Sequence, residues 1–323
     1  MKKALITGIT GQDGAYLSQF LLGKGYDVYG LVRRLSTLNF WRLDELGIRD
    51  KIHFLEGDLM DATALNSIME SLRPAEIYNL AAQSFVGTSW QQSILTTEVN
   101  TLGTVHLLNA MKHHHPEGRF YQASTSEMYG NSNIDNIQDE RTSLHPRSPY
   151  AISKLAAHWF TINYRESYGL FACSGILFNH ESPLRGIEFV TRKITDGVAR
   201  IKLGLAKDIR LGNLDARRDW GFAGDYVEAM WLMLQQPKPD DFVVSTGENR
   251  SVRDFLTAAF REIDIGDWTP YVQQDPAMLR PSEVHELCGK SDKARKVLGW
   301  KPKVSFEALV KMMVEADLRR LQK

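Results

Sequence analysis

The 323-residue sequence predicts an α/β fold, a doubly wound parallel sheet with a smaller, interleaved C-terminal substrate domain. Short apolar runs rich in β-branched residues alternate with longer segments of helical periodicity, which is typical of parallel sheets covered on both faces. A glycine-rich loop follows the first of these runs at once. The alternation loosens after residue 178, where prolines punctuate expected loops at positions 237, 239, 270, 276 and 281.

The expected elements follow from the lengths and periods of these runs. Short apolar runs predict buried strands at 3–8, 27–33, 52–56, 76–80, 119–123 and 172–178. Helical periodicity predicts helices between them at 15–22, 61–72, 92–112 and 150–167. Two later helices are expected at 186–204 and near 252–263. Ser251 with Asp254 forms a capping-box pattern at the start of the second.

The loop after the first expected strand suits a dinucleotide phosphate. Three glycines spaced three apart separate the strand from the helix behind it. In that order the helix N-terminus and bare backbone amides face the phosphates. The alternative is a tight turn that needs glycine only for its positive φ angles. We favour the cofactor loop, which comprises Gly8, Thr10, Gly11, Gln12, Asp13 and Gly14.

The end of the second expected strand bears on the choice of cofactor. NAD sites place an acidic residue about 20 residues beyond the glycine loop, where it holds the ribose 2′-hydroxyl. Here Arg33 and Arg34 stand at that point, and no acidic residue follows until Asp44. Guanidinium groups suit a 2′-phosphate, so the sequence predicts NADP. The alternative is an ordinary exposed basic pair.

Four residues from two segments predict the chemistry. Tyr150 and Lys154 lie four apart on an expected helix, so the ammonium can approach the phenol, lower its pKa and make it a usable base. Thr125 and Glu127 follow the strand expected at 119–123, at the sheet edge where ligands bind. The cluster supplies a base that can deprotonate a sugar hydroxyl and a carboxylate that can deprotonate the adjacent carbon. This combination predicts transient oxidation followed by elimination of water.

These residues resemble the extended short-chain dehydrogenase/reductase family and, within it, the GDP-mannose 4,6-dehydratases. The similar segments run nearly from end to end, at 8–17, 121–127, 179–183, 217–221 and 293–302. The resemblance implies a Rossmann fold, NADP as cofactor, and GDP-mannose as a substrate converted to GDP-4-keto-6-deoxy-mannose. In the related dTDP-glucose dehydratases an Asp stands where this chain has Ser126. Glu127 is therefore expected to act as both base and acid.

The resemblance also implies contacts that the pattern alone does not give. Further cofactor contacts are expected at Asp58, Leu59, Leu80, Ala81, Ala82, Gln83, Ser84, His180 and Arg185. The substrate's diphosphate is assigned to Lys193, Arg218 and Arg280, its sugar to Asn179 and Glu181, and its nucleoside to Glu283. Exposed charge is the alternative for the three basic residues, and tight packing is the alternative for Ala81 and Ala82.

Domain organisation and assembly are likewise implied by the resemblance. Residues 1–178 and 212–247 are expected to form the NADP-binding Rossmann domain, and 179–211 with 248–323 the nucleotide-sugar-binding domain. Residues 34–41 combine basic and apolar side chains in a loop beside the expected cofactor. In the family this loop can reach a neighbouring subunit, so a homodimer or homotetramer is expected, with the tetramer preferred.

Composition excludes several other classes. Thirty-nine basic and 39 acidic residues give a net charge of +0, so no overall field attracts nucleic acid or an anionic membrane. No apolar run reaches membrane-spanning length, and Cys173 and Cys288 are too few for a disulfide framework, so a cytoplasmic protein is expected. Residues 113–115 are three consecutive histidines. On a helix they would point in different directions, so we expect no metal site.

Two alternative functions remain at this stage. A nucleotide-sugar 4-epimerase or 4-keto reductase needs Tyr150 and Lys154 but has no use for a carboxylate at Glu127. A non-catalytic NADP-binding sensor or scaffold could keep the glycine loop, yet nothing in binding alone calls for Tyr150, Lys154 and Glu127 together.

Overall fold

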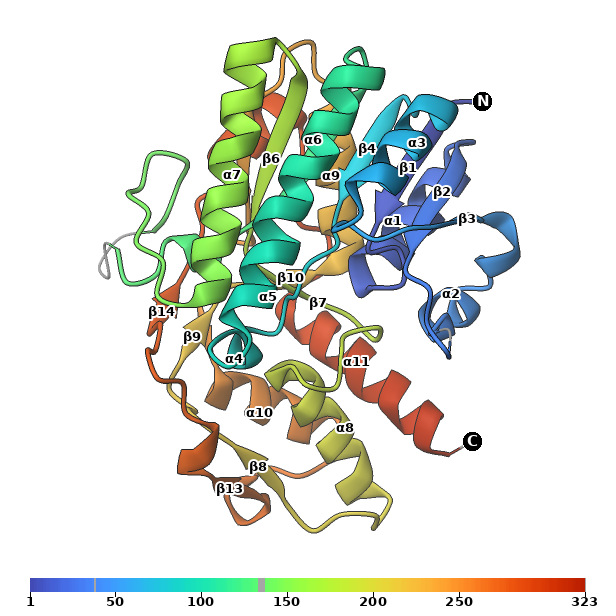
Figure 1. Cartoon of the computed structure of the whole chain (residues 1–323). Coiled ribbons are helices and arrows are strands. Elements are labelled where there is room, and N and C mark those ends of the chain that lie inside the picture. The colour runs from blue at the N-terminus through green and yellow to red at the C-terminus, as the bar shows by residue number, and fades with distance from the viewer. Residues whose placement is uncertain (38, 133–136, 323) are drawn as a thin grey trace.

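A computed structural model of the chain describes residues 1–37, 39–132 and 137–322. Its upper layer is a sheet of seven strands in which every neighbouring pair is parallel, as the sequence predicts (Figure 1). The strand order is β11-β6-β5-β4-β1-β2-β3. The strands span Lys3–Thr7 (β1), Asp27–Val32 (β2), His53–Glu56 (β3), Glu76–Asn79 (β4), Arg119–Thr125 (β5), Phe171–Leu177 (β6) and Asp241–Val244 (β11).

Helices cover both faces of this sheet. One face carries α3 (Ala62–Leu72), α6 (Gly103–His114) and α7 (Pro149–Tyr168), and the other carries α1 (Gln12–Gly23) and α9 (Ala223–Gln235) (Figure 1). Alternation along β1 explains the two layers, because successive strand residues point to opposite faces. Ala4 and Ile6 pack into the core with α1 and α9, whereas Leu5 joins the core with α3 and α6.

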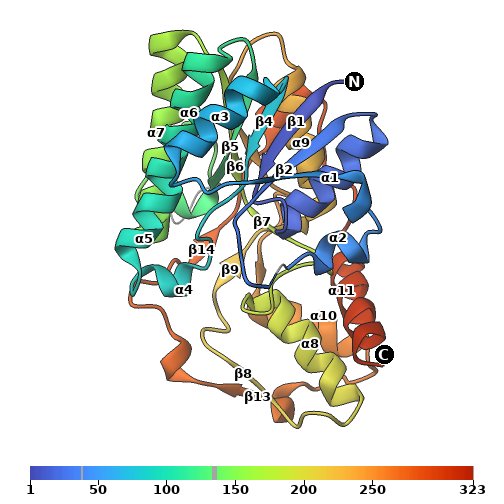
Figure 2. The same ribbon diagram turned by 45° about the vertical axis from the view of Figure 1, so that its right-hand side comes forward.

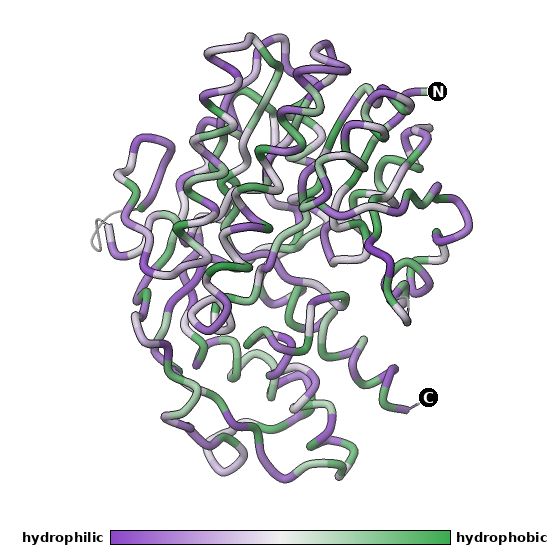
Figure 3. Tube along the Cα trace, in the orientation of Figure 1, coloured by the Kyte–Doolittle hydropathy of each residue, from purple (hydrophilic) through white to green (hydrophobic). Residues whose placement is uncertain are grey.

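A smaller lobe lies below the sheet and contains the C-terminus (Figure 2). Its helices are α8 (Val190–Lys202), α10 (Val252–Arg261) and α11 (Phe306–Leu321), around a core of their own. Short strands surround them: β7 (Asn179–Glu181), β8 (Ile209–Leu211), β9 (Arg217–Arg218), β10 (Trp220–Phe222), β12 (Arg250–Ser251), β13 (Val272–Gln274) and β14 (Glu286–Leu287). The outer loops are mostly hydrophilic in Figure 3, while hydrophobic stretches follow the strands.

The chain passes between the upper sheet and the smaller lobe more than once. β11 pairs with β6 at the edge of the upper sheet, although segments of the lower lobe precede and follow it in the sequence. α9 packs on α1, so residues 223–244 lie with the upper layer. The ends of the parallel strands and the lower lobe therefore face each other.

The helix expected at 92–112 is the clearest departure from the predicted elements. The structure divides it into α5 (Ser93–Thr97), a π-helical turn at Glu98–Leu102 and α6. Polar side chains of the turn bond to α7: Asn100 Nδ2 donates to Ser153 Oγ over 3.0 Å, and Thr101 Oγ1 donates to the Ser153 carbonyl over 2.9 Å. The wider turn brings these side chains to α7, and helical periodicity alone does not reveal it.

The start of α10 is predicted more closely than those of α1 and α8, which begin at Gln12 and Val190 and not at residues 15 and 186. The capping box at Ser251 is confirmed: Asp254 N donates to Ser251 Oγ over 3.1 Å, and Ser251 N donates to Asp254 Oδ2 over 2.7 Å. α8 and α10 lie within the ranges expected at 186–204 and 252–263. The remaining short helices are α2 (Trp41–Glu45), α4 (Val86–Ser89) and turns at Arg49–Lys51, Ser126–Met128, Thr269–Tyr271, Pro276–Met278 and Ala294–Leu298.

Candidate active site

The glycine loop joins β1 to α1 beside the point where the strand order reverses. Gly8 has φ +69°, and a Cβ there would lie 2.7 Å from the backbone nitrogen of Ala81. A Cβ on Gly14 would lie 2.4 Å from the carbonyl oxygen of Gly8. Side chains are therefore sterically excluded, and bare backbone lines the start of α1. This cradle fits a dinucleotide pyrophosphate, which binds at helix N-termini of such folds.

An ion pair ties the start of α1 to β7. His180 Nε2 lies 2.8 Å from Asp13 Oδ2, and its Nδ1 lies 2.8 Å from the Phe178 carbonyl. Burial acts to lower the pKa of His180, but the Asp13 charge together with the hydrogen bonds to Asp13 and to the Phe178 carbonyl outweighs burial, so the pKa is raised. Both ring nitrogens face acceptors, which favours the imidazolium. Gln12 Nε2 also donates to the His180 carbonyl over 3.0 Å.

The four candidate catalytic residues meet at the carboxyl end of β5. Thr125 ends this strand, and its Oγ1 accepts a hydrogen bond from Glu127 N over 3.3 Å. The short helix at 126–128 turns the Glu127 carboxylate into the same cavity. Tyr150 and Lys154 reach it from the first turns of α7, which Ser148 caps by accepting from Ala151 N.

Burial governs the charges of the tyrosine and the lysine. The expectation that Lys154 lowers the pKa of Tyr150 is contradicted, because burial raises it to about 12 despite a hydrogen bond with Thr125. The Glu127 charge acts in the same direction. Burial also lowers the pKa of Lys154 to about 8. Removing either group from water disfavours its charged form. The Lys154 ammonium, which was expected to stabilise the Tyr150 phenolate, is therefore itself destabilised by burial.

A cavity of about 380 Å³ contains this cluster. Its walls come from the glycine loop, the ends of β4, β5 and β6, the start of α7, and residues 177–189. Of the residues assigned from the sequence, it brings together Gly8, Thr10, Gly11, Gln12, Asp13, Gly14, Leu80, Ala82, Ser84, Thr125, Glu127, Tyr150, Lys154, Asn179, His180, Arg185 and Arg280.

A second cavity of about 210 Å³ adjoins the first on the side of the smaller lobe. All six residues assigned to the substrate line it: Asn179, Glu181, Lys193, Arg218, Arg280 and Glu283. The two cavities share the residues Val86, Asn179, Arg185, Glu188, Phe189 and Arg280. One elongated molecule could therefore extend from the catalytic cluster into the lower lobe.

Charged contacts line this boundary. Arg280 Nη1 lies 3.4 Å from Glu127 Oε1, and Arg218 Nη2 lies 3.9 Å from Glu283 Oε1. Burial lowers the pKa of Arg218, although the Glu127 charge opposes that shift. Arg185 Nε lies 3.0 Å from the buried carboxylate of Glu181. The guanidinium groups give the boundary an affinity for anionic oxygens.

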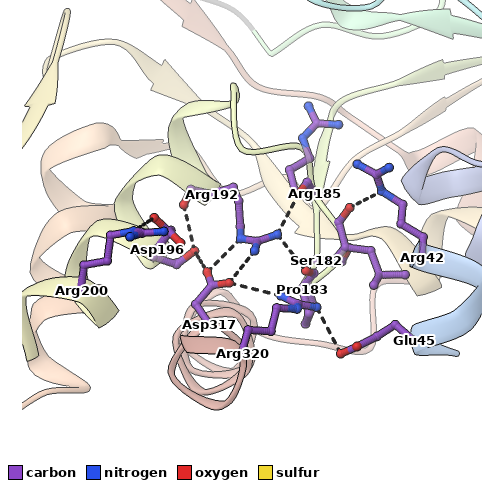
Figure 4. A network of polar contacts seen from close by, with 12 residues as sticks. Arg42, Glu45, Ser182, Pro183, Arg185, Arg192, Asp196, Arg200, Asp317 and Arg320 are labelled. Atoms are coloured by element: carbon purple, nitrogen blue, oxygen red, sulfur yellow. Dashed lines mark hydrogen bonds and ion pairs between the residues drawn. The ribbon is translucent and has the colours of Figure 1, made fainter. Parts of the chain in front are cut away.

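A network behind the site holds the loop that carries Arg185 (Figure 4). The Arg192 guanidinium donates to the carbonyl oxygens of Pro183 over 3.2 Å and Arg185 over 3.0 Å. Its other nitrogens bond to Asp317 of α11, which is 1% exposed. The smaller lobe thus fixes the backbone of residues 182–185 directly behind the cavity.

Six of the assigned cofactor residues do not line either cavity. Arg33 and Arg34 are exposed beyond the end of β2. Asp58 and Leu59 follow β3, where Leu59 is buried and its carbonyl contacts His106 Nδ1 at 2.8 Å. The remaining two lie behind the wall: Ala81 N donates to Thr7 Oγ1, and Gln83 N donates to Asn100 Oδ1.

The sequence reasoning missed Arg42 and Glu188, which both line the first cavity. Arg42 Nε donates to the Leu184 carbonyl over 2.7 Å, and its Nη1 donates to the Thr10 carbonyl over 3.2 Å. It thereby joins the glycine loop to the loop that carries Arg185. No spacing or motif marks these positions, because the fold alone brings them to the cavity.

The histidine run and the cysteines lie away from this site. His113 and His114 end α6, His115 follows it, and His115 Nδ1 is 2.9 Å from Glu117 Oε1. Within the described residues, no three His, Cys, Asp or Glu side chains gather as a metal site would require. Cys173 and Cys288 are both buried and unpaired with each other. No helix in the described part of the chain is both long and apolar enough to cross a bilayer.

The fold and the site define an enzyme of the extended short-chain dehydrogenase/reductase class. The crystal structure of Thermus thermophilus UDP-glucose 4-epimerase in complex with NAD is similar, with a TM-score of 0.85, 27% identity and 98% of each chain covered. The chain belongs to the GDP-mannose 4,6-dehydratase family, whose model matches residues 5–313.

Named relatives agree with this family over nearly the whole chain. GDP-mannose 4,6 dehydratase 2 of Arabidopsis thaliana is 54% identical, covering 98% of this chain and 87% of its own length. The GDP-mannose 4,6-dehydratase of Vibrio cholerae is 47% identical, with 99% and 95% covered.

Proposed function

We infer that this chain is a hydro-lyase that dehydrates GDP-mannose to GDP-4-keto-6-deoxy-mannose, and we propose NADP as its cofactor. The family supports the reaction. The observation that carries the mechanism is the meeting of Thr125, Glu127, Tyr150 and Lys154 in one cavity. A cavity with both a hydroxyl base and a separate carboxylate can oxidise one carbon and deprotonate the next.

The residues around the glycine loop fit the proposed cofactor. The bare backbone between Gly8 and Gly14 would hold the pyrophosphate, and the buried ammonium of Lys154 would hold ribose hydroxyls. When bound, NADP⁺ would supply an acceptor that takes a hydride and gives it back within one catalytic cycle. The crystal structure of the Thermus epimerase, which contains NAD, supports a nicotinamide cofactor in this fold.

The chain's own residues would then move two protons. Tyr150 would take the proton of the C4 hydroxyl as its phenolate, a form that the positive charges of Lys154 and bound NADP⁺ would have to favour against burial, while Thr125 hydrogen-bonds the same oxygen. The resulting C4 ketone acidifies the C5–H bond, and Glu127 removes that proton. Glu127 then protonates the C6 hydroxyl, which leaves as water, and return of the hydride to C6 would be matched by addition of a solvent-exchanged proton at C5. Glu127 thus serves as base and acid in turn, and Ser126 beside it has no acidic group to share the task.

The second cavity would hold the remainder of the substrate. Arg218, Arg280 and Lys193 offer cationic groups to a diphosphate, and Glu283 offers an acceptor to the base. Asn179 lines both cavities, and Glu181 lines the second. With its diphosphate and base in the second cavity, a nucleotide sugar would direct its hexose toward Tyr150.

Glu127 discriminates between this function and its rivals. A 4-epimerase or 4-keto reductase would use Tyr150 and Lys154 but gains nothing from a carboxylate beside Thr125. A non-catalytic sensor would have no use for a buried base cluster at all, since burying Tyr150 and Lys154 disfavours their ions. The dehydratase is therefore the function that uses every residue of the cluster.

The function is tested by incubating the purified protein with GDP-mannose. A 4-keto product gives a chromophore in alkali, and solvent deuterium should enter at C5. Tyr150→Phe should suppress even the initial oxidation, whereas Glu127→Gln should slow turnover by about 10² to 10⁴-fold and let reduced-nicotinamide absorbance accumulate. Native turnover by Glu127→Gln would refute the elimination role and favour the epimerase or reductase.

A homo-oligomeric, cytoplasmic enzyme is the proposed setting. Exposed apolar side chains gather on α5 and on the neighbouring α7, among them Ile94, Leu95, Ile152 and Trp159. Such patches are typical of protein interfaces. The two buried thiols suit a reducing compartment.

A further inference from the structure

Arg280 contacts the candidate base Glu127 and lines both cavities. Its Nη1 lies 3.4 Å from the Glu127 carboxylate. Glu127 lines only the first cavity. The cation that the second cavity offers to a phosphate is therefore the same cation that neutralises the candidate base.

The other charges around Glu127 do not share this double position. Tyr150 faces it from α7 and is uncharged at neutral pH, since its pKa is about 12. Arg218 faces it from β9, but it also lies 3.9 Å from Glu283 and borders only the second cavity. Among the described residues, Arg280 forms the ion pair with Glu127.

Arg280 is also placed to move. It lies on the irregular segment between the turn at 276–278 and β14, outside any helix or strand. Its side chain is 32% exposed, whereas that of Glu127 is 10% exposed. The carboxylate is thus nearly buried, while the guanidinium remains accessible to a ligand. A single 3.4 Å contact is also weaker than a bidentate pair, so a diphosphate can displace it.

We propose that Arg280 is a switch that binds Glu127 in the free enzyme and leaves it for the diphosphate of the nucleotide sugar. The proposal rests on the function inferred above. While the Arg280 guanidinium contacts Glu127 Oε1, that oxygen is occupied, so withdrawal of Arg280 frees it to accept a proton only when a diphosphate is bound. A sugar without a diphosphate would leave the base neutralised, and phosphate recognition would become a condition for C5 deprotonation.

The proposal is tested by a double-mutant cycle on the binding of GDP, which needs no turnover. Glu127→Gln should tighten GDP binding by about threefold to tenfold in calorimetry, because Arg280 no longer has to leave a carboxylate. In an Arg280→Gln background the same substitution should bring no gain. Arg217→Gln is the matched control, since Arg217 is an exposed neighbour of Arg218. In that background the full gain should persist.

An equal gain in all three backgrounds would overturn the switch, because simple repulsion between Glu127 and the phosphates would explain it. Arg280→Lys keeps the charge and should retain part of the coupling, provided circular dichroism shows the native fold.

Absence of any turnover by the native protein would contradict the proposed function, while the GDP cycle would still decide the switch.

Discussion

At the scale of single residues, the site buries groups whose ions need water. Lys154 is 3% exposed, and its pKa falls from the ordinary 10.5 to about 8. Below pH 8 the ammonium is charged in both the folded and unfolded chain, so the full cost of its burial falls on the folded state. Above pH 10.5 neither state carries the charge. Stability should therefore rise between these two values.

Lys154→Met should stabilise the protein at pH 7 while abolishing activity. The pKa shift corresponds to about 3 kcal/mol, and the substitution removes this cost. The gain, measured as a difference in urea midpoints, should shrink when the comparison is repeated near pH 10. Lys311→Met is the control, because Lys311 is exposed on α11. A gain that does not depend on pH would mean that packing and not charge is responsible.

Cofactor choice depends on the two arginines beyond β2. We expect NADP⁺ to bind more tightly than NAD⁺, because Arg33 and Arg34 are exposed and available to a 2′-phosphate. Arg33→Ser with Arg34→Ser should remove most of that preference in calorimetry at moderate salt. Arg261→Ser, an exposed arginine at the end of α10, should leave it unchanged. Equal affinity of the native protein for both dinucleotides would defeat the assignment.

The residues that sequence patterns can locate are those in contiguous motifs. The glycine loop and Thr125 to Glu127 follow directly after strands, so the sheet fixes their position at its carboxyl edge. Arg42 has no such context: it reaches the cavity because its guanidinium bonds to the Thr10 and Leu184 carbonyls, which lie far apart in the sequence. The raised pKa of Tyr150 was also not predicted from the sequence, because the burial that causes it depends on the complete fold.

At the scale of elements, apolar runs and caps were sufficient to predict most strands and helices of the upper layer. The six expected strands are all present in the sheet. β11 is only four residues long. The return of this part of the chain to the Rossmann domain was expected from the family resemblance and not from periodicity. The break at 98–102 depends on side-chain bonds to α7, a tertiary contact that local periodicity does not report.

The capping box offers a test at this scale. Ser251→Ala should lower the free energy of unfolding by about 1 kcal/mol, because Asp254 N loses its acceptor at the start of α10. The urea midpoint should fall with an unchanged m-value. Ser71→Ala removes an exposed hydroxyl within α3 and should have little effect. A loss confined to activity would mean that the cap serves the site and not the helix.

At the scale of the whole molecule, we expect a tetramer. The loop at 34–41 is exposed at Leu35, whereas Phe40 packs in the core and Trp41 begins α2; Leu38 lies outside the described residues. The apolar patch on α5 and α7 offers a separate surface. Light scattering should give four times the chain mass, and Trp159→Glu should lower it. A monomer at micromolar concentration would exclude this assembly.

The late position of β11 has a consequence for synthesis on the ribosome. β6 emerges several dozen residues before its neighbour, and translation at about 5–20 residues per second leaves that edge open for on the order of several seconds. An open parallel edge can pair with any other extended chain. A nascent chain therefore carries a complete glycine loop, Glu127 and Tyr150 before its sheet is closed. Chaperone protection during that interval would decide the yield of native enzyme.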